Sequence, residues 1–252
     1  MNKIYLYDGT FSNLLSLIIH LIKLGIKPDM IVSEKEYIPN LLEEPVYINI
    51  INQEEKIKYL DNYFSKRIKT TLYYTFLSSS ENRELVMYYF IKNALKYKDK
   101  VFCYRNLNCV NKTINIVKYV SNETHKLKGF LRFKKMQNNF YYAEIKPINN
   151  VIELLAIHFK KRLSNELFVI KDVGRKIYAI YDKLNITYLN EEDFISLNLK
   201  LDDSEEDIEK LWKTFFETIA IKERKNLKCQ QNFMPKRYWQ YIIEMEDKLW
   251  KK

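Results

Sequence analysis

Basic, aromatic and amide side chains are concentrated in residues 224–239, near the C-terminus. Lys236 and Arg237 follow Pro235, a residue that suits the first turn of a helix, where free backbone N–H groups can bind a phosphate beside the cations. The aromatic residues that come next could stack on a base. We therefore predict a nucleic-acid-binding segment with these candidate contacts: Arg224, Asn226, Gln230, Lys236, Arg237, Tyr238 and Trp239.

The same segment also has a structural interpretation. Trp239 and Phe233 could pin a terminal helix to the core, and the neighbouring cations would then be solvated surface charges. Both interpretations stay open at the level of residue types.

A second group of polar side chains comprises Glu123, His125, Lys128 and Arg132. Lys128 and Arg132 could hold a phosphate, and His125 could exchange a proton near neutral pH. The alternation of Arg132 and Lys134 with apolar neighbours is equally typical of a strand in a sheet with one solvated face. Arg132 is therefore a candidate nucleic-acid contact with a structural alternative.

The third group lies on a predicted helix, where His158 and Arg162 are four residues apart and share one face. That face is largely apolar, which favours a core histidine over a catalytic one. Arg162 beside it is a further candidate nucleic-acid contact.

Asp8 occupies the loop after the first predicted strand, the position at which open α/β sheets bind ligands. Thr10 or Ser12 in the same loop could instead only cap the helix that follows. If the protein were an enzyme, its candidate acid and base groups would be Asp8, His125 and His158.

Metal and cofactor motifs are missing from the sequence. Cys103, Cys109 and Cys229 have no C-x-x-C spacing, and the three histidines have no H-x-x-x-H spacing. The chain also lacks G-x-G-x-x-G, the phosphate-loop lysine motif and G-x-S-x-G. We therefore expect no metal and no cofactor.

Composition limits the class of protein. The 252 residues are 47% hydrophobic, enough for a sizeable core, and 42 basic against 32 acidic side chains give a net charge of +10. This charge would attract nucleic acid, anionic lipid or acidic protein, although a lysine-rich composition bias would also produce it. No run of about 18 apolar residues and no signal peptide are found. We expect a cytoplasmic protein without a membrane partner.

Hydrophobic periodicity predicts an α+β fold with an α/β-like N-terminal part, then a mainly antiparallel sheet with a covering helix, and a helical C-terminal segment. Strands are predicted at residues 3–7, 46–50, 130–134, 141–145, 167–170, 176–181 and 186–189, the third and fourth forming a hairpin. Helices are predicted over 14–22, within 54–98, from 110, over 151–163 and over 211–219. The predicted regions are 1–108, 109–200 and 201–252.

Residues 191–209 carry nine acidic side chains against one lysine. A cation site or a mimic of the nucleic-acid backbone is one interpretation. The spacing of Ser204 and Asp207 favours the other, in which the acids stabilise the start of the last predicted helix.

Four segments, taken in order along the chain, resemble a bacterial family labelled probable DNA metabolism proteins. They are Tyr7 to Phe11, Glu123 to Phe133, His158 to Arg162 and Glu223 to Trp239. Members of that family are typically encoded beside a radical-SAM protein assigned to DNA modification or repair, and a related module is fused to uracil-DNA-glycosylase-like domains. The resemblance implies DNA repair or modification as the setting and a radical-SAM protein as a candidate partner. It assigns no catalytic residue.

Our leading hypothesis is a DNA-binding accessory protein that presents DNA to a partner enzyme with radical-SAM or glycosylase-like chemistry. One alternative is an enzyme that acts on DNA itself, as a glycosylase or a nuclease. The other is an adaptor that binds proteins and has no affinity for DNA.

Overall fold

The computed structural model describes residues 4–39, 45–48, 63–136, 140–195, 226–242 and 245. The chain divides into two compact units, Met1–Ser121 and Asn122–Lys252, and the division falls inside helix α5 (Asn108–Phe130). The predicted boundary between residues 108 and 109 falls at the start of that helix, and the one between 200 and 201 lies outside the described residues. The predicted α+β class is confirmed.

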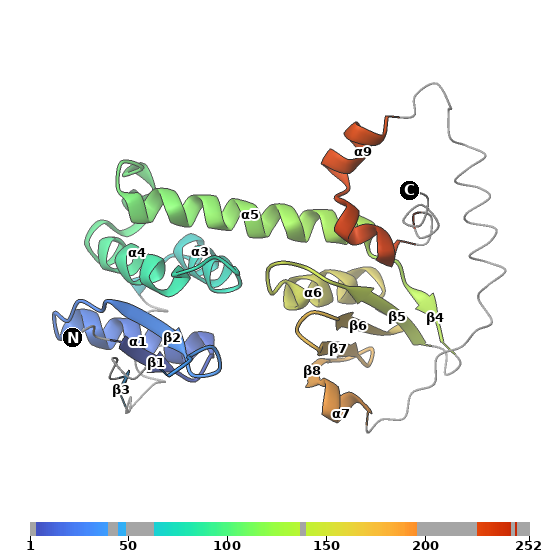
Figure 1. Ribbon diagram of the computed structural model, residues 1–252, viewed down its shortest axis with the longest axis horizontal. Coiled ribbons are helices and arrows are strands. Elements are labelled where there is room, and N and C mark those ends of the chain that lie inside the picture. The colour runs from blue at the N-terminus through green and yellow to red at the C-terminus, as the bar shows by residue number, and fades with distance from the viewer. Residues whose placement is uncertain are drawn as a thin grey trace. The chain divides into compact units, whose positions relative to one another are not determined.

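The N-terminal unit contains a three-stranded sheet in the order β2-β1-β3, in which β1 pairs in parallel with both neighbours (Figure 1). Its elements are β1 (Ile4–Tyr7), α1 (Phe11–Lys23), β2 (Met30–Ser33), β3 (Pro45–Tyr47), α3 (Lys66–Phe76), α4 (Arg83–Tyr97) and the 3-10 helix η1 (Lys98–Cys103). The apolar run of β1 is buried along its whole length, as expected of a central parallel strand. Thr10 caps α1, because its hydroxyl accepts a hydrogen bond from the Asn13 backbone N–H at 3.2 Å.

Two details of this unit differ from the sequence prediction. The four-residue strand β2 was not predicted. The apolar spacing of Leu85, Val86, Tyr89, Phe90 and Ala94 predicted the buried face of α4, but only Phe90 and Ala94 of these are buried. The other buried residues of α4 are Glu84, Met87, Tyr88 and Ile91.

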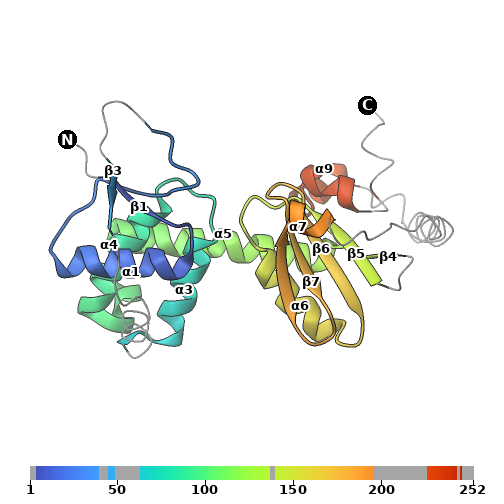
Figure 2. The same ribbon diagram turned by 90° about the horizontal axis from the view of Figure 1, so that it is seen from below.

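The C-terminal unit contains a five-stranded sheet in the order β4-β5-β6-β7-β8. Its elements after α5 are β4 (Lys134–Lys135), β5 (Phe140–Ile145), α6 (Ile152–Arg162), β6 (Leu167–Asp172), β7 (Ile177–Tyr181), β8 (Ile186–Asn190) and the short helix α7 (Glu191–Ile195). Only β5 and β6 pair in parallel, and α6 connects them. The predicted sheet is therefore mainly antiparallel, and α6 covers one face of it against β6, β7 and β8 (Figure 2).

The predicted hairpin is confirmed by the antiparallel pairing of β4 with β5, but the predicted strand over residues 130–134 is wrong except at Lys134. Helix α5 continues to Phe130, because the buried Leu127 and Leu131 extend its apolar stripe by one more turn. The Leu131 backbone N–H donates to Leu127 O at 2.9 Å, so the helical bonding continues to this point. Only Lys134 and Lys135 pair with β5. The turn between the strands, residues 137–139, lies outside the described residues.

The C-terminal segment contains α9 (Leu227–Phe233) and the 3-10 helix η3 (Lys236–Tyr241), which contacts β5. Pro235 directly precedes η3, which agrees with its predicted place at the start of a helix. The helix predicted over 211–219 and most of the acidic stretch lie outside the described residues. In the part of the chain that is described, no helix has the length and apolar character needed to cross a membrane.

Candidate functional site

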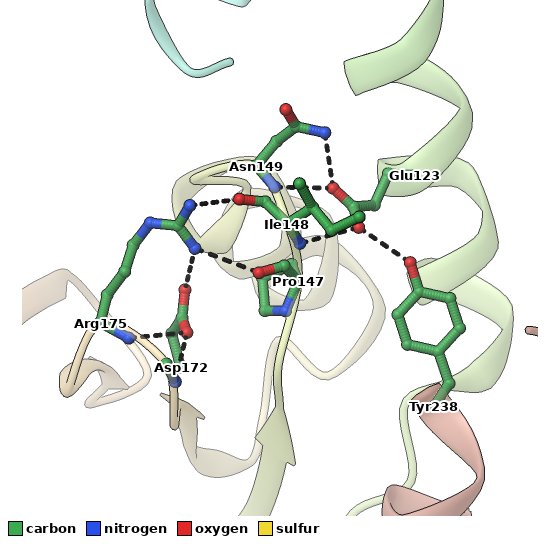
Figure 3. Close-up of polar contacts among 8 residues, drawn as sticks. Glu123, Pro147, Ile148, Asn149, Asp172, Arg175 and Tyr238 are labelled. Atoms are coloured by element: carbon green, nitrogen blue, oxygen red, sulfur yellow. Dashed lines mark hydrogen bonds and ion pairs between the residues drawn. The ribbon is translucent and has the colours of Figure 1, made fainter. Parts of the chain in front are cut away.

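Glu123 is a buried carboxylate in the C-terminal unit that joins three segments distant in sequence (Figure 3). Its Oε1 accepts hydrogen bonds from the Ile148 N–H at 2.9 Å and from the Tyr238 hydroxyl at 2.8 Å. Its Oε2 accepts two more from Asn149, from the backbone N–H at 2.8 Å and from Nδ2 at 2.6 Å. Helix α5, the loop after β5 and the C-terminal motif are thus tied to one carboxylate.

Arg237 extends this network toward solvent. Its Nη2 donates to the Tyr238 hydroxyl at 2.9 Å and lies 3.6 Å from Glu123 Oε1. The guanidinium carbon is 4.7 Å from the centre of the Tyr238 ring, within the range of a cation–π contact. Burial, with a contribution from Glu123, raises the pKa of Tyr238, so the phenol remains a protonated donor. The Arg237 side chain is held in place while 42% of it is exposed.

The loop after β5 is also fixed from its other side (Figure 3). Arg175 donates through Nη1 to Pro147 O at 3.3 Å and through Nη2 to Ile148 O. Asp172, which is fully buried, lies 3.0 Å from Arg175 Nη1 and accepts from the Arg175 backbone N–H at 3.1 Å. Two charged networks therefore position the residues of this loop.

A surface pocket of about 320 Å³ lies where the loop after β5 meets η3. It is lined by Lys146, Pro147, Ile148, Lys236, Arg237 and Gln240. Three of these six residues are cations and none is a carboxylate. We call this feature the cationic pocket; its chemistry suits a phosphate group, which accepts charge-assisted hydrogen bonds from lysine and arginine.

The structure places two of the predicted contacts, Lys236 and Arg237, in the cationic pocket. It corrects the predicted base stacking, because Tyr238 is 1% exposed and Trp239 is 4% exposed. The Trp239 indole donates from Nε1 to Met234 O at 2.9 Å and belongs to the core. The structural interpretation is therefore right for Trp239, but wrong for Phe233, whose side chain is 71% exposed.

The amide side chains of the same motif have structural partners. Asn226 caps α9, since its Oδ1 accepts from the Cys229 N–H at 2.9 Å. Gln230 Nε2 lies 3.6 Å from the sulfur of Met245. Both side chains help to hold α9 in place. Arg224 lies outside the described residues.

The other two predicted arginine contacts lie in different surroundings. Arg132 Nη1 donates to Gly129 O at 2.8 Å, at the C-terminal end of α5, where cations interact favourably with the helix dipole. Arg162 is exposed in the last turn of α6 and contributes to the electrostatic surroundings of His158.

His125 is exposed on α5, whereas His158 is half-buried on α6 with its ring 5.1 Å from that of Phe159. Desolvation lowers the pKa of His158, and the nearby charges of Lys128 and Arg162 lower it further. The half-buried imidazole thus lies beside an aromatic ring and near cations, and its core role stays a prediction.

Asp8 belongs to the N-terminal unit. Its Oδ1 accepts from the Thr10 backbone N–H at 2.8 Å and from the Thr10 hydroxyl at 2.7 Å, which makes it part of the turn that leads into α1. Among the described residues, no cluster of three or more His, Cys, Asp or Glu side chains could hold a metal ion.

Sequence reasoning missed Lys146, Asn149 and Gln240. Lys146 directly follows strand β5 and Asn149 lies in the loop after it, so polar side chains in the loop after a strand were the available signal. Gln240 carried no such signal, because its place in the pocket depends on the turn of η3. Glu123 was grouped with its sequence neighbours, although its partners lie far along the chain.

A family model described as a domain of unknown function, DUF4130, matches residues 81–244, which is well over half of the chain. The chain belongs to this family. The matched range contains Glu123 and every residue of the cationic pocket, whereas Asp8 precedes it. No curated protein and no solved structure matches the chain.

Proposed function

We propose that the protein is a cytoplasmic DNA-binding accessory protein that acts in DNA repair or modification. It holds DNA for a partner enzyme, for which a radical-SAM protein is the candidate. The observation that carries the binding proposal is the cationic pocket, where Lys146 meets Lys236 and Arg237.

The pocket is suited to a backbone phosphate because its cations differ in rigidity. Arg237 is oriented by Glu123 and Tyr238, so its guanidinium loses little freedom when it binds an anion. Lys146 and Lys236 are flexible point charges that can follow the phosphate. Phosphate contacts of this kind fix the position of a protein on DNA without reading its sequence.

Two further observations support DNA as the source of the phosphate. The net charge of +10 favours a polyanion, because the long-range field raises its local concentration. The four segments that resemble probable DNA metabolism proteins also include the Lys236 and Arg237 motif. The proposed setting in repair or modification, and the proposed partner, depend on that resemblance.

The test is binding of a fluorescein-labelled oligonucleotide, measured by anisotropy between about 50 and 200 mM salt. We expect the logarithm of the binding constant to fall linearly with the logarithm of salt, with a slope of about −0.9 for each neutralised phosphate of duplex DNA. Lys146→Ala and Lys236→Ala should each reduce the slope by about one and weaken binding whatever the base sequence. Lys27→Ala, an exposed lysine in the N-terminal unit, is the matched control.

Two results would count against the proposal. If the wild-type protein has no affinity for DNA at low salt, it is not a DNA-binding protein. If it binds DNA but both pocket variants behave like Lys27→Ala, the cationic pocket is not the binding site.

A further inference from the structure

Phe233 is the last residue of α9, and its side chain is 71% exposed. A large apolar ring in contact with water is unfavourable, and of the two rings expected in the core only Trp239 is buried. The ring is therefore outside the core and is accessible to a ligand.

The elements that present this ring are anchored. Asn226 caps the start of α9, and Gln230 contacts Met245 in its middle. Just after the helix, Met234 O accepts the hydrogen bond from the Trp239 indole. A ring on a fixed support loses little conformational freedom when it binds a flat partner.

Phe233 lies close to the cationic pocket along the chain. Met234 and Pro235, the two residues between it and Lys236, are not helical, with ψ of 89° and 140°. Three residue steps separate the two Cα atoms by at most about 11 Å. A few nucleotides of a single strand can cover this distance.

We propose that Phe233 stacks on an unpaired base of a DNA strand whose phosphate occupies the cationic pocket. The preferred ligand is then single-stranded or locally unpaired DNA. Every base has a π-face, so such stacking tolerates any sequence, but in a duplex these faces are covered by neighbouring base pairs. This inference rests on the proposed function and adds to it the form of DNA that is bound.

The test compares single-stranded and duplex oligonucleotides of the same sequence. Phe233→Leu keeps an apolar side chain but removes the ring, and it should weaken single-strand binding about 5- to 150-fold while leaving duplex binding unchanged. Tyr119→Leu, which removes an exposed aromatic ring from the N-terminal unit, should change neither affinity.

Phe233→Trp gives a direct readout. We expect it to retain single-strand affinity and to show quenching of the added indole fluorescence by oligothymidylate, beyond any change seen in the wild-type protein. Thermal unfolding of each variant should match the wild type, because the substituted side chain is exposed.

The outcomes separate this inference from the proposed function. If the wild-type protein binds neither form of DNA, both fail. If it binds DNA with the expected salt dependence, but Phe233→Leu matches the wild type on single strands and the Phe233→Trp signal is not quenched, only the stacking inference is overturned. Equal losses on single strands and duplex would also overturn it.

Discussion

Replacing Glu123 with Gln tests whether the buried carboxylate holds the C-terminal motif in place. The amide has the size of the carboxylate, so the change removes charge and one acceptor atom without leaving a cavity. The best placement puts the amide nitrogen at the Oε1 position, because the Tyr238 hydroxyl can turn to accept from it. The Ile148 N–H then faces another donor and has lost its partner.

The expected cost follows from these contacts. A buried N–H without a partner costs about 1–3 kcal/mol. The two bonds from Asn149 persist but lose their charge assistance, which roughly halves their strength. The desolvation cost of the carboxylate disappears and offsets part of the loss. We expect the free energy of unfolding of the C-terminal unit to fall by about 2–4 kcal/mol.

Tryptophan fluorescence reports this unit selectively, because Trp212, Trp239 and Trp250 all belong to it and the N-terminal unit has none. In a urea titration, the fluorescence midpoint of Glu123→Gln should fall by about 1–2 M. Glu166→Gln, an exposed residue of the same unit, should stay within about 0.5 kcal/mol of the wild type. If the two variants unfold alike, Glu123 does not tie the three segments together and our interpretation of the network is wrong.

Two further predictions concern the same unit. Tyr238→Phe removes the hydroxyl shared by Glu123 and Arg237, so chemical denaturation should show a loss of about 1.5–3 kcal/mol, and an unchanged midpoint would contradict this. The NMR titration of His158 should give a pKa below the ordinary value of about 6.5, chiefly from desolvation and secondarily from Lys128 and other nearby cations. As the pH falls below that ordinary value, the unfolded chain takes up the proton first, so His158 lowers stability toward acid and contributes nothing above it. His158→Gln should remove this part of the pH dependence.

Local patterns predicted most of the elements. The apolar runs of β1 and β7 and the helical spacing of α1 each carry their own signal over the length of the element. The prediction failed where the competing signal came from packing. Residues 130–134 alternate like a strand, but α5 continues to Phe130, and the buried Leu131 after it still donates to Leu127 O.

The site was only partly predictable for a similar reason. Lys236 and Arg237 could be predicted as phosphate contacts because they are adjacent cations. The Glu123 carboxylate that orients Arg237 could not, because it lies more than a hundred residues earlier. The choice of which aromatic ring is buried also depends on tertiary contacts. Trp239 and Phe233 are both large aromatic residues in the sequence. The fold of α9 and η3 buries the first and leaves the second exposed.

The family match begins at residue 81, just before α4, yet the buried face of α4 packs against earlier elements. Phe90, Ile91 and Ala94 are fully enclosed, and α4 contacts α1, α3 and β2, all of which precede the match. A truncated polypeptide that starts at residue 81 would lose these contacts and expose the apolar face of α4 to solvent. We expect such a polypeptide to aggregate. A polypeptide made for expression of the family-matched region should therefore keep the first eighty residues, because they cover this face of α4.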